Sequence, residues 1–211
     1  MLRNLLSSLL LLLSLASAYL YAGDDFVSGF KPMNEPLKTK EDFLKIYNQW
    51  LYSDLDSTSR NIYFLELAYV AGYNHPIQAL TTITNEIQFD RYKYLLQMHI
   101  CTLLTQEYIN YGYFFVKEHV YFYNQEFKTN YLNGYDVAEF YFNGARKYWN
   151  EAVSNAQFAD SIKGWRTDLN YYEDEIYRIK TGDLNYYKVL DNLMVRVNNN
   201  RAEITRLWGT N

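Results

Sequence analysis

The sequence predicts an all-α protein made of antiparallel helical hairpins, and three observations carry this prediction. Turn-forming residues are scarce, with 9 glycines and 3 prolines in 211 residues, which favours long helices over a many-stranded sheet. Apolar residues make up 49% of the chain and charged residues 21%, as in a globular protein with a buried core. A small residue followed by a bulky residue four positions later occurs three times at intervals of 33 residues, in Ala79 and Ile83, Gly112 and Val116, and Ala145 and Trp149. Such an interval is typical of stacked helical hairpins, in which small residues let helices approach closely.

Residues 1–18 have the three parts of a secretory signal peptide. Arg3 supplies a positive charge, Leu5 to Leu15 form an apolar run, and Ala16-Ser17-Ala18 is an A-x-A cleavage site, with cleavage after Ala22 as an alternative. The apolar run is shorter than the roughly 20 residues of a membrane-spanning helix. We therefore expect a periplasmic or secreted protein with no transmembrane helix after cleavage. An uncleaved signal anchor that tethers the protein to the membrane is the alternative.

Residues 19–38 are predicted to be an extended lead-in, because Pro32 and Pro36 stand among polar residues there. Residues 39–211 are predicted to form a single all-helical domain. Its first helix should begin at a capping box formed by Thr39 and Asp42.

A second helix is expected from about Arg60 to Ala71, with Gly72 to Pro76 as its stop. Asn74 and Pro76 then predict the start of a partner helix that carries Ala79 and Ile83. These two helices would form the first hairpin.

The stretch from Phe89 to Phe127 has no proline, so its periodicity fits either one long helix or two. The 33-residue interval favours two helices, with a turn near Asn110 to Gly112. Another break is predicted at Asn130 to Gly134, followed by a helix over Tyr135 to Ala156.

The C-terminal part of the chain is predicted to contain two more helices. A loop at Ser161 to Thr167 comes first, and the helix after it, through Ile176, should stop at Gly182. The final helix starts near Leu184 and is expected to run on to Trp208.

The segment from Ala145 to Val153 resembles the second helix of a tetratricopeptide repeat, with Ala145, the aromatic Trp149 four residues on and Ala152 three beyond that. Gly72 through Ile83 resembles the turn and second-helix start of another such unit. The resemblance covers about Arg60 to Ala156. It implies a short, curved array of helix pairs whose concave side binds a protein segment or another ligand.

Motifs for catalysis, metal binding and nucleic-acid binding are missing from the sequence. The three histidines, His75, His99 and His119, lack the spacing that places two metal ligands on one helix face. Cys101, the single cysteine, lies in an apolar run and is expected to be a buried, inert thiol. The formal net charge of −4 gives no reason to expect nucleic acid. We therefore expect no enzyme activity, no metal and no cofactor.

Three consecutive carboxylates, Glu173, Asp174 and Glu175, stand near a predicted helix start. They would complement the helix dipole there. The alternative is an acidic lip that receives a basic partner.

Aromatic residues make up 18% of the chain, with 23 tyrosines, which fits either a compositional bias or an aromatic binding face. Between Tyr111 and Tyr123 they are spread round most of the circumference of the expected helix, so some rings must be exposed or covered by another chain. We predict a partner-binding surface there, with Glu118 and His119 as its polar rim. The predicted partner-binding residues are Tyr111, Tyr113, Phe114, Glu118, His119 and Tyr121.

Together these observations favour a non-enzymatic interaction or scaffold protein that binds a protein partner in the cell envelope, within a flagellar, secretion or transport assembly. A periplasmic small-ligand-binding protein with an aromatic pocket is the first alternative. A glycan-cleaving hydrolase is the second, although the Glu-Ser and Gly-Leu-Met-Gln motifs common in such enzymes are missing. The oligomeric state stays open.

Overall fold

A computed structural model describes residues 38–51, 58–162 and 168–209, and the predicted signal peptide and nearly all of the lead-in lie outside them. Leu37–Asn211 is one compact unit and is described here by itself. Its described residues are almost all helical, which confirms the all-α prediction. The α-helices are α2 (Lys40–Leu51), α3 (Thr58–Val70), α4 (Glu86–Tyr113), α5 (Lys128–Ser161), α6 (Asn170–Thr181) and α7 (Tyr186–Trp208), with short 3₁₀ helices at Pro76–Gln78 and Phe122–Phe127.

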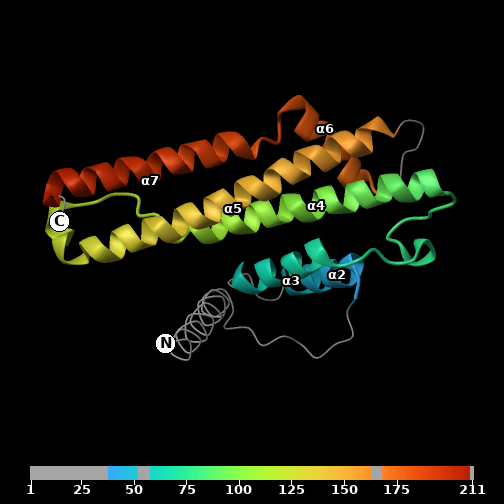
Figure 1. Ribbon diagram of the computed structural model, residues 1–211, viewed down its shortest axis with the longest axis horizontal. Helices are drawn as coiled ribbons and strands as arrows, with labels where there is room; N and C mark the ends of the chain where they lie inside the picture. Colours follow the sequence, from blue (N-terminus) through green and yellow to red (C-terminus); the bar gives the residue numbers. More distant parts are fainter. Residues whose placement is uncertain (1–37, 52–57, 163–167, 210–211) are drawn as a thin grey trace, which may run out of the picture. The chain divides into compact units, whose positions relative to one another are not determined.

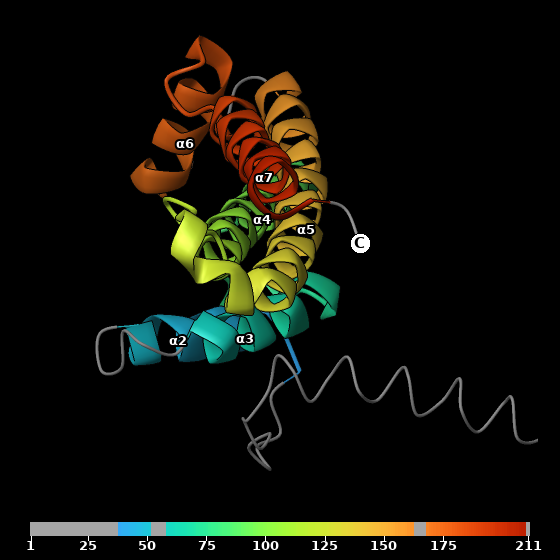
Figure 2. The same cartoon turned by 90° about the vertical axis from the view of Figure 1, so that its left-hand side faces the viewer.

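The two longest helices, α4 and α5, form an antiparallel pair at the centre of this unit (Figure 1). Helix α7 packs along α5, and α3 packs against α4, with α2 beside α3. Figure 2 looks nearly along α4, α5 and α7 and shows α6 on one side of them and the α2–α3 pair beneath. Every helix of this unit therefore contacts the α4–α5 pair or packs on a helix that does.

Small residues let α4 and α5 approach closely. A Cβ atom added to Gly112 at the end of α4 would lie 2.8 Å from the ring of Phe142 on α5. One added to Gly144 on α5 would lie 2.6 Å from the ring of Tyr108 on α4. Ala145, next along α5, is fully buried. The prediction that Gly112 and Ala145 mark close helix contacts is thus confirmed for a single pair of helices.

The 33-residue interval does not describe a repeated unit. Helix α5 alone has 34 residues and α4 has 28, so a 33-residue unit cannot hold two such helices. The partner helix predicted to carry Ala79 and Ile83 is wrong: the chain makes one 3₁₀ turn at Pro76–Gln78 and reaches no α-helix before Glu86. His75 caps that turn, because its Nδ1 accepts a hydrogen bond from the Ile77 N–H at 3.3 Å.

Two local signals at helix ends gave correct predictions. The N–H of Thr39 donates to Asp42 and the N–H of Asp42 donates to the Thr39 hydroxyl, which is the predicted capping box of α2. Gly182 follows α6 with φ of 80°, a left-handed conformation that glycine adopts without steric cost. The final helix ends at Trp208, as predicted.

The break predicted at Asn130 to Gly134 is wrong, because these residues lie inside α5. Gly134 serves packing instead. A Cβ atom added there would lie 3.2 Å from the carbonyl oxygen of Phe115, a residue of the segment that precedes α5. A glycine stands inside the helix here because a neighbouring backbone passes too close for a larger residue to fit easily.

Buried and partly buried hydrogen bonds between phenols and carboxylates attach the α2–α3 pair to α4 and α5. Glu41 of α2 accepts from Tyr92 of α4 at 2.8 Å, and Glu107 of α4 accepts from Tyr47 of α2 at 3.2 Å. Tyr69 of α3 donates to Glu151 of α5 at 2.7 Å. These bonds satisfy carboxylates that would otherwise be costly to bury.

Lys40 joins the start of α2 to the end of α3. Its ammonium group donates to the carbonyl oxygens of Ala68 at 2.9 Å and Tyr69 at 2.6 Å, among the last carbonyls of α3. Burial lowers the pKa of Lys40 to about 8.

Candidate functional site

The segment between α4 and α5 carries most of the predicted partner-binding residues. This segment was expected to be helical, and the structure shows that it is not an α-helix. Helix α4 ends at Tyr113, and only the six residues Phe122–Phe127 form a 3₁₀ turn before α5 begins. The stretch from Phe89 to Phe127 therefore holds a single α-helix, so the second helix that the 33-residue interval favoured is wrong. The end of α4 at Tyr113 lies one residue beyond the turn predicted at Asn110 to Gly112. We call residues 113–127 the aromatic segment.

Helix α7 holds the backbone of the aromatic segment in place. The side-chain amide of Asn200 donates to the carbonyl oxygen of Lys117 at 2.7 Å. The indole N–H of Trp208 donates to the carbonyl oxygen of Phe122 at 3.1 Å. Arg196 lies over the Tyr113 ring at 5.9 Å. These contacts run from Arg196 to Trp208 on α7, and a helix rises 1.5 Å per residue, so the segment follows α7 for about 18 Å. The yellow-green chain beneath α7 in Figure 1 shows this course.

Large side chains of the aromatic segment point into solvent although the backbone is held. Phe114 and Phe122 are each 74% exposed and Tyr123 is 63% exposed. The other exposed rings are Tyr113, Tyr121 and Phe127. At about 200 Å² per side chain, the six expose roughly 700 Å² in all. A contiguous apolar patch of that size on a soluble protein usually marks an interaction surface.

The predicted partner-binding residues differ in their exposure. Tyr113, Phe114, Glu118, His119 and Tyr121 are exposed. Tyr111, the last predicted member, is half-buried at the end of α4, where its ring packs edge to face on Tyr141 of α5 at 4.7 Å.

Three rings follow one another where the extended part of the aromatic segment enters the 3₁₀ turn that begins at Phe122. The Tyr121 ring lies 6.1 Å from the His119 ring and 5.4 Å from the Tyr123 ring, with which it is nearly parallel at 4°. Residues at i and i+2 of an extended chain share one side, which explains why the His119 and Tyr121 rings are neighbours, while Tyr123 lies in the first turn of the 3₁₀ helix. The Phe122 ring stands edge to face against Tyr123 at 5.4 Å.

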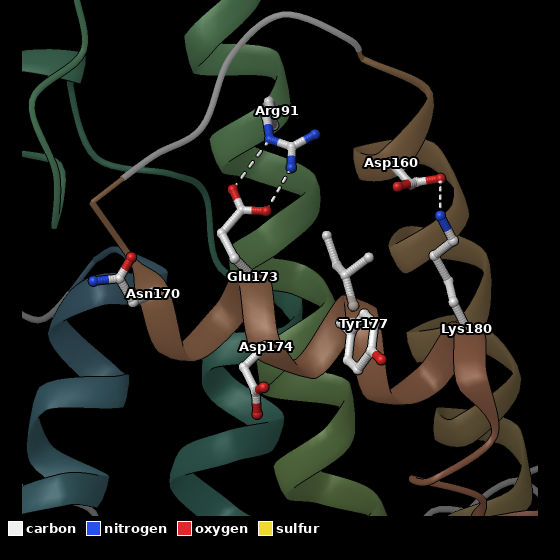
Figure 3. Close-up of a pocket in the computed structure, with 8 residues that line it drawn as sticks. Arg91, Asp160, Asn170, Glu173, Asp174, Tyr177 and Lys180 are labelled. Carbon is white, nitrogen blue, oxygen red and sulfur yellow. Dashed lines mark hydrogen bonds and ion pairs between the residues drawn. The ribbon is translucent and has the colours of Figure 1, made fainter.

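A hollow of about 500 Å³ lies between α6 and the ends of α4 and α5. Figure 3 shows Glu173 pointing to Arg91 and Lys180 pointing to Asp160 from α6, while Asp174 points away from both ion pairs. Arg91 holds Glu173 with two hydrogen bonds, at 2.6 and 3.3 Å, and also donates to the carbonyl oxygens of Ala159 and Ile162 at the end of α5. Four of the five charged residues that line the hollow, all except Asp174, are paired with one another. These pairs attach α6 to the ends of α4 and α5, and we call them the α6 clasp.

A buried histidine–carboxylate pair lies further along the same α4–α6 contact. His99 Nδ1 is 2.8 Å from a carboxylate oxygen of Glu175, and the ring of Tyr172 stacks on the imidazole at 4.3 Å. Two of the three consecutive acidic residues thus face inward to partners on α4, and Asp174 alone is exposed. The sequence did not indicate these partners, because they stand 76 and 82 residues away along the chain.

Across residues 38–51, 58–162 and 168–209, no three His, Cys, Asp or Glu side chains gather where they could hold a metal ion. In the same ranges, no helix combines the length and apolar character needed to cross a membrane. Cys101 is fully buried, as predicted, and burial raises the pKa of its thiol to about 12.

Comparison with known proteins gives one family match. A family model described as a domain of unknown function, DUF8513, matches residues 87–207, more than half of the chain. The matched range contains nearly all of α4 and α7, with the aromatic segment, α5 and α6 between them. No curated protein and no solved structure matches the chain.

Proposed function

The chain belongs to the DUF8513 family, and we propose that it is a non-enzymatic interaction protein that binds a protein partner through its aromatic segment. One observation carries the proposal: large rings are exposed on a backbone that α7 holds in place. A held backbone loses little conformational entropy on binding, so exposed rings there contribute more to affinity than on a free loop. Buried aromatic side chains at interfaces contribute about 2 kcal/mol or more each.

The signal-like N-terminus supports a place for this function outside the cytoplasm, in the cell envelope. N-terminal sequencing of the mature protein should find a start at Tyr19 or Gly23. Full-length protein in the membrane fraction would contradict export and support the signal anchor.

The binding test uses single substitutions of exposed rings. In Phe114→Ser, Phe122→Ser and Tyr123→Ser we expect unchanged helicity and melting, because these side chains are mostly solvent-exposed. Affinity for a partner recovered from the envelope fraction should fall about 30-fold for each ring that the partner buries, the equivalent of about 2 kcal/mol. Recovery by pull-down and mass spectrometry, followed by calorimetric titration, measures this.

Phe158→Ser is the matched control, because Phe158 is a 55% exposed phenylalanine near the other end of α5. It should leave the affinity unchanged. If the three folded variants bind every partner as tightly as the unsubstituted protein, the interface is not the aromatic segment and the proposal fails.

A further inference from the structure

The aromatic segment carries charged side chains of both signs beside its rings. Lys117, Glu118 and Glu126 are exposed, and Arg196 of α7 is half-buried next to Tyr113, to whose hydroxyl it donates at 3.3 Å. Within the described part of the chain, none of these four charged side chains forms an ion pair. Two are cations and two are anions, so the charge of this surface sums to zero, although the chain carries a formal net charge of −4.

Other charged residues near the aromatic segment already have partners within the protein. Lys128, which begins α5, donates to the carbonyl oxygen of Gly209 at 2.8 Å. Arg201 of α7 pairs with Asp136 and Glu139 of α5, both at 2.6 Å. The four charges without an ion pair are therefore those that a bound partner would meet.

This balance of charge favours a second copy of the chain over a strongly charged partner. An acidic protein would bring its carboxylates to Glu118 and Glu126, and a basic protein would bring its cations to Lys117 and Arg196. Like charges that face each other across an interface cost free energy. A second copy brings both signs in equal number. In a two-fold dimer the same surface contacts itself, so the cations of one copy can face the anions of the other.

The rings form an apolar surface large enough for such a dimer. His119, Tyr121 and Tyr123 follow one another in ring contact, and Phe122 stands against Tyr123. The exposed rings offer roughly 700 Å² in each copy, so two copies would bury roughly 1,400 Å². Stable interfaces bury about 1,200–2,000 Å² in total. Homodimer interfaces are also more apolar than transient ones, which fits a surface composed mainly of Phe and Tyr rings.

We propose that the aromatic segment binds the same segment of a second copy of this chain about a two-fold axis, so that the protein forms a homodimer. The inference rests on the proposed function, because it names the partner of the same surface. The rings of the two copies would pack at the centre of the interface, and Lys117, Glu118, Glu126 and Arg196 would form its charged rim.

The first test is sedimentation velocity of the purified full chain between about 1 and 100 µM. We expect twice the mass of one chain at the higher concentrations. Each ring occurs twice in a two-fold dimer, so Phe122→Ser and Tyr123→Ser should each weaken it about 1,000-fold, the equivalent of about 4 kcal/mol. Phe158→Ser, which removes an exposed phenylalanine near the other end of α5, should leave the dimer unchanged. Circular dichroism checks that all three variants keep their helicity.

A charge-reversal test separates a second copy from any other partner. Lys117→Glu makes the surface negative and Glu118→Lys makes it positive, so each variant alone should dimerise more weakly than the unsubstituted chain. A mixture of the two variants should form a mixed dimer about tenfold tighter than either forms with itself, and added salt should reduce this difference. Lys188→Glu, at an exposed position near the start of α7, is the control for net charge and should leave dimerisation unchanged.

Three results would overturn the inference. A chain that stays monomeric up to about 100 µM has no such dimer. If its ring variants still lose an envelope protein in the pull-down, the proposed function stands and the second copy alone is rejected. A dimer that Phe122→Ser and Tyr123→Ser leave intact forms through another face. A mixture of the two charge variants that associates no more tightly than each variant alone contradicts the charge pairing that selects a second copy.

Discussion

Replacing Arg91 by methionine should destabilise the protein more than any other change at the α6 clasp. The Arg91 side chain is 8% exposed, and its guanidinium group binds the carboxylate of Glu173, whose side chain is 21% exposed. The same group donates to two carbonyl oxygens at the end of α5. Breaking a buried ion pair by removing one partner typically costs 3–5 kcal/mol. Because Glu173 is partly exposed, we expect the lower end, about 3 kcal/mol.

Thermal and urea denaturation followed by circular dichroism would measure this loss. For a domain of this size, about 3 kcal/mol corresponds to a fall in melting temperature of about 6–12 °C. Lys180→Gln is the control: it breaks the neighbouring ion pair with Asp160, whose two side chains are 52% and 45% exposed. Exposed pairs contribute at most about 1 kcal/mol.

A double variant separates the two roles of Arg91. Arg91→Met with Glu173→Leu removes both charges, so the cost of a partly buried carboxylate without its arginine disappears. The loss that remains reports the hydrogen bonds to the end of α5. An Arg91→Met protein within about 0.5 kcal/mol of the unsubstituted protein would refute the clasp, because such a value is typical of an ordinary surface substitution.

Three further predictions follow from buried groups. Ala145→Leu should overpack the α4–α5 contact and cost about 1–3 kcal/mol in a urea titration, whereas an unchanged midpoint would mean that the site can absorb a larger side chain. Cys101, whose pKa burial raises to about 12, should resist iodoacetamide at pH 8 until urea unfolds the chain, as followed by mass spectrometry. Burial also raises the pKa of Glu107 above 4.5, so the folded protein binds the carboxyl proton more tightly than the unfolded chain does. The stability that this proton contributes is fully present below pH 4.5 and is lost as the pH rises through the folded-state pKa of Glu107. Glu107→Gln should therefore lose less melting temperature than the unsubstituted protein between pH 4 and pH 7, and identical profiles would contradict this.

Local signals predicted helix ends well where one residue determines the backbone. Thr39 and Asp42 cap each other within a single turn, and Gly182 adopts the positive φ that ends α6. The same reasoning failed at Asn130 to Gly134, because a glycine inside a helix can also make room for another chain segment. The backbone of Phe115 passes Gly134 there, and nothing near Gly134 in the sequence announces it.

Exposed rings in the aromatic segment were predicted from their number, although the prediction assumed an α-helix where the structure has none. Too many rings stood between Tyr111 and Tyr123 for the core to bury, and several are indeed exposed. Their arrangement depends on Asn200 and Trp208, which stand 83 and 86 residues away along the chain from the carbonyls that they bind. The Arg91–Glu173 and His99–Glu175 pairs have comparable separations, and no periodic pattern links such residues.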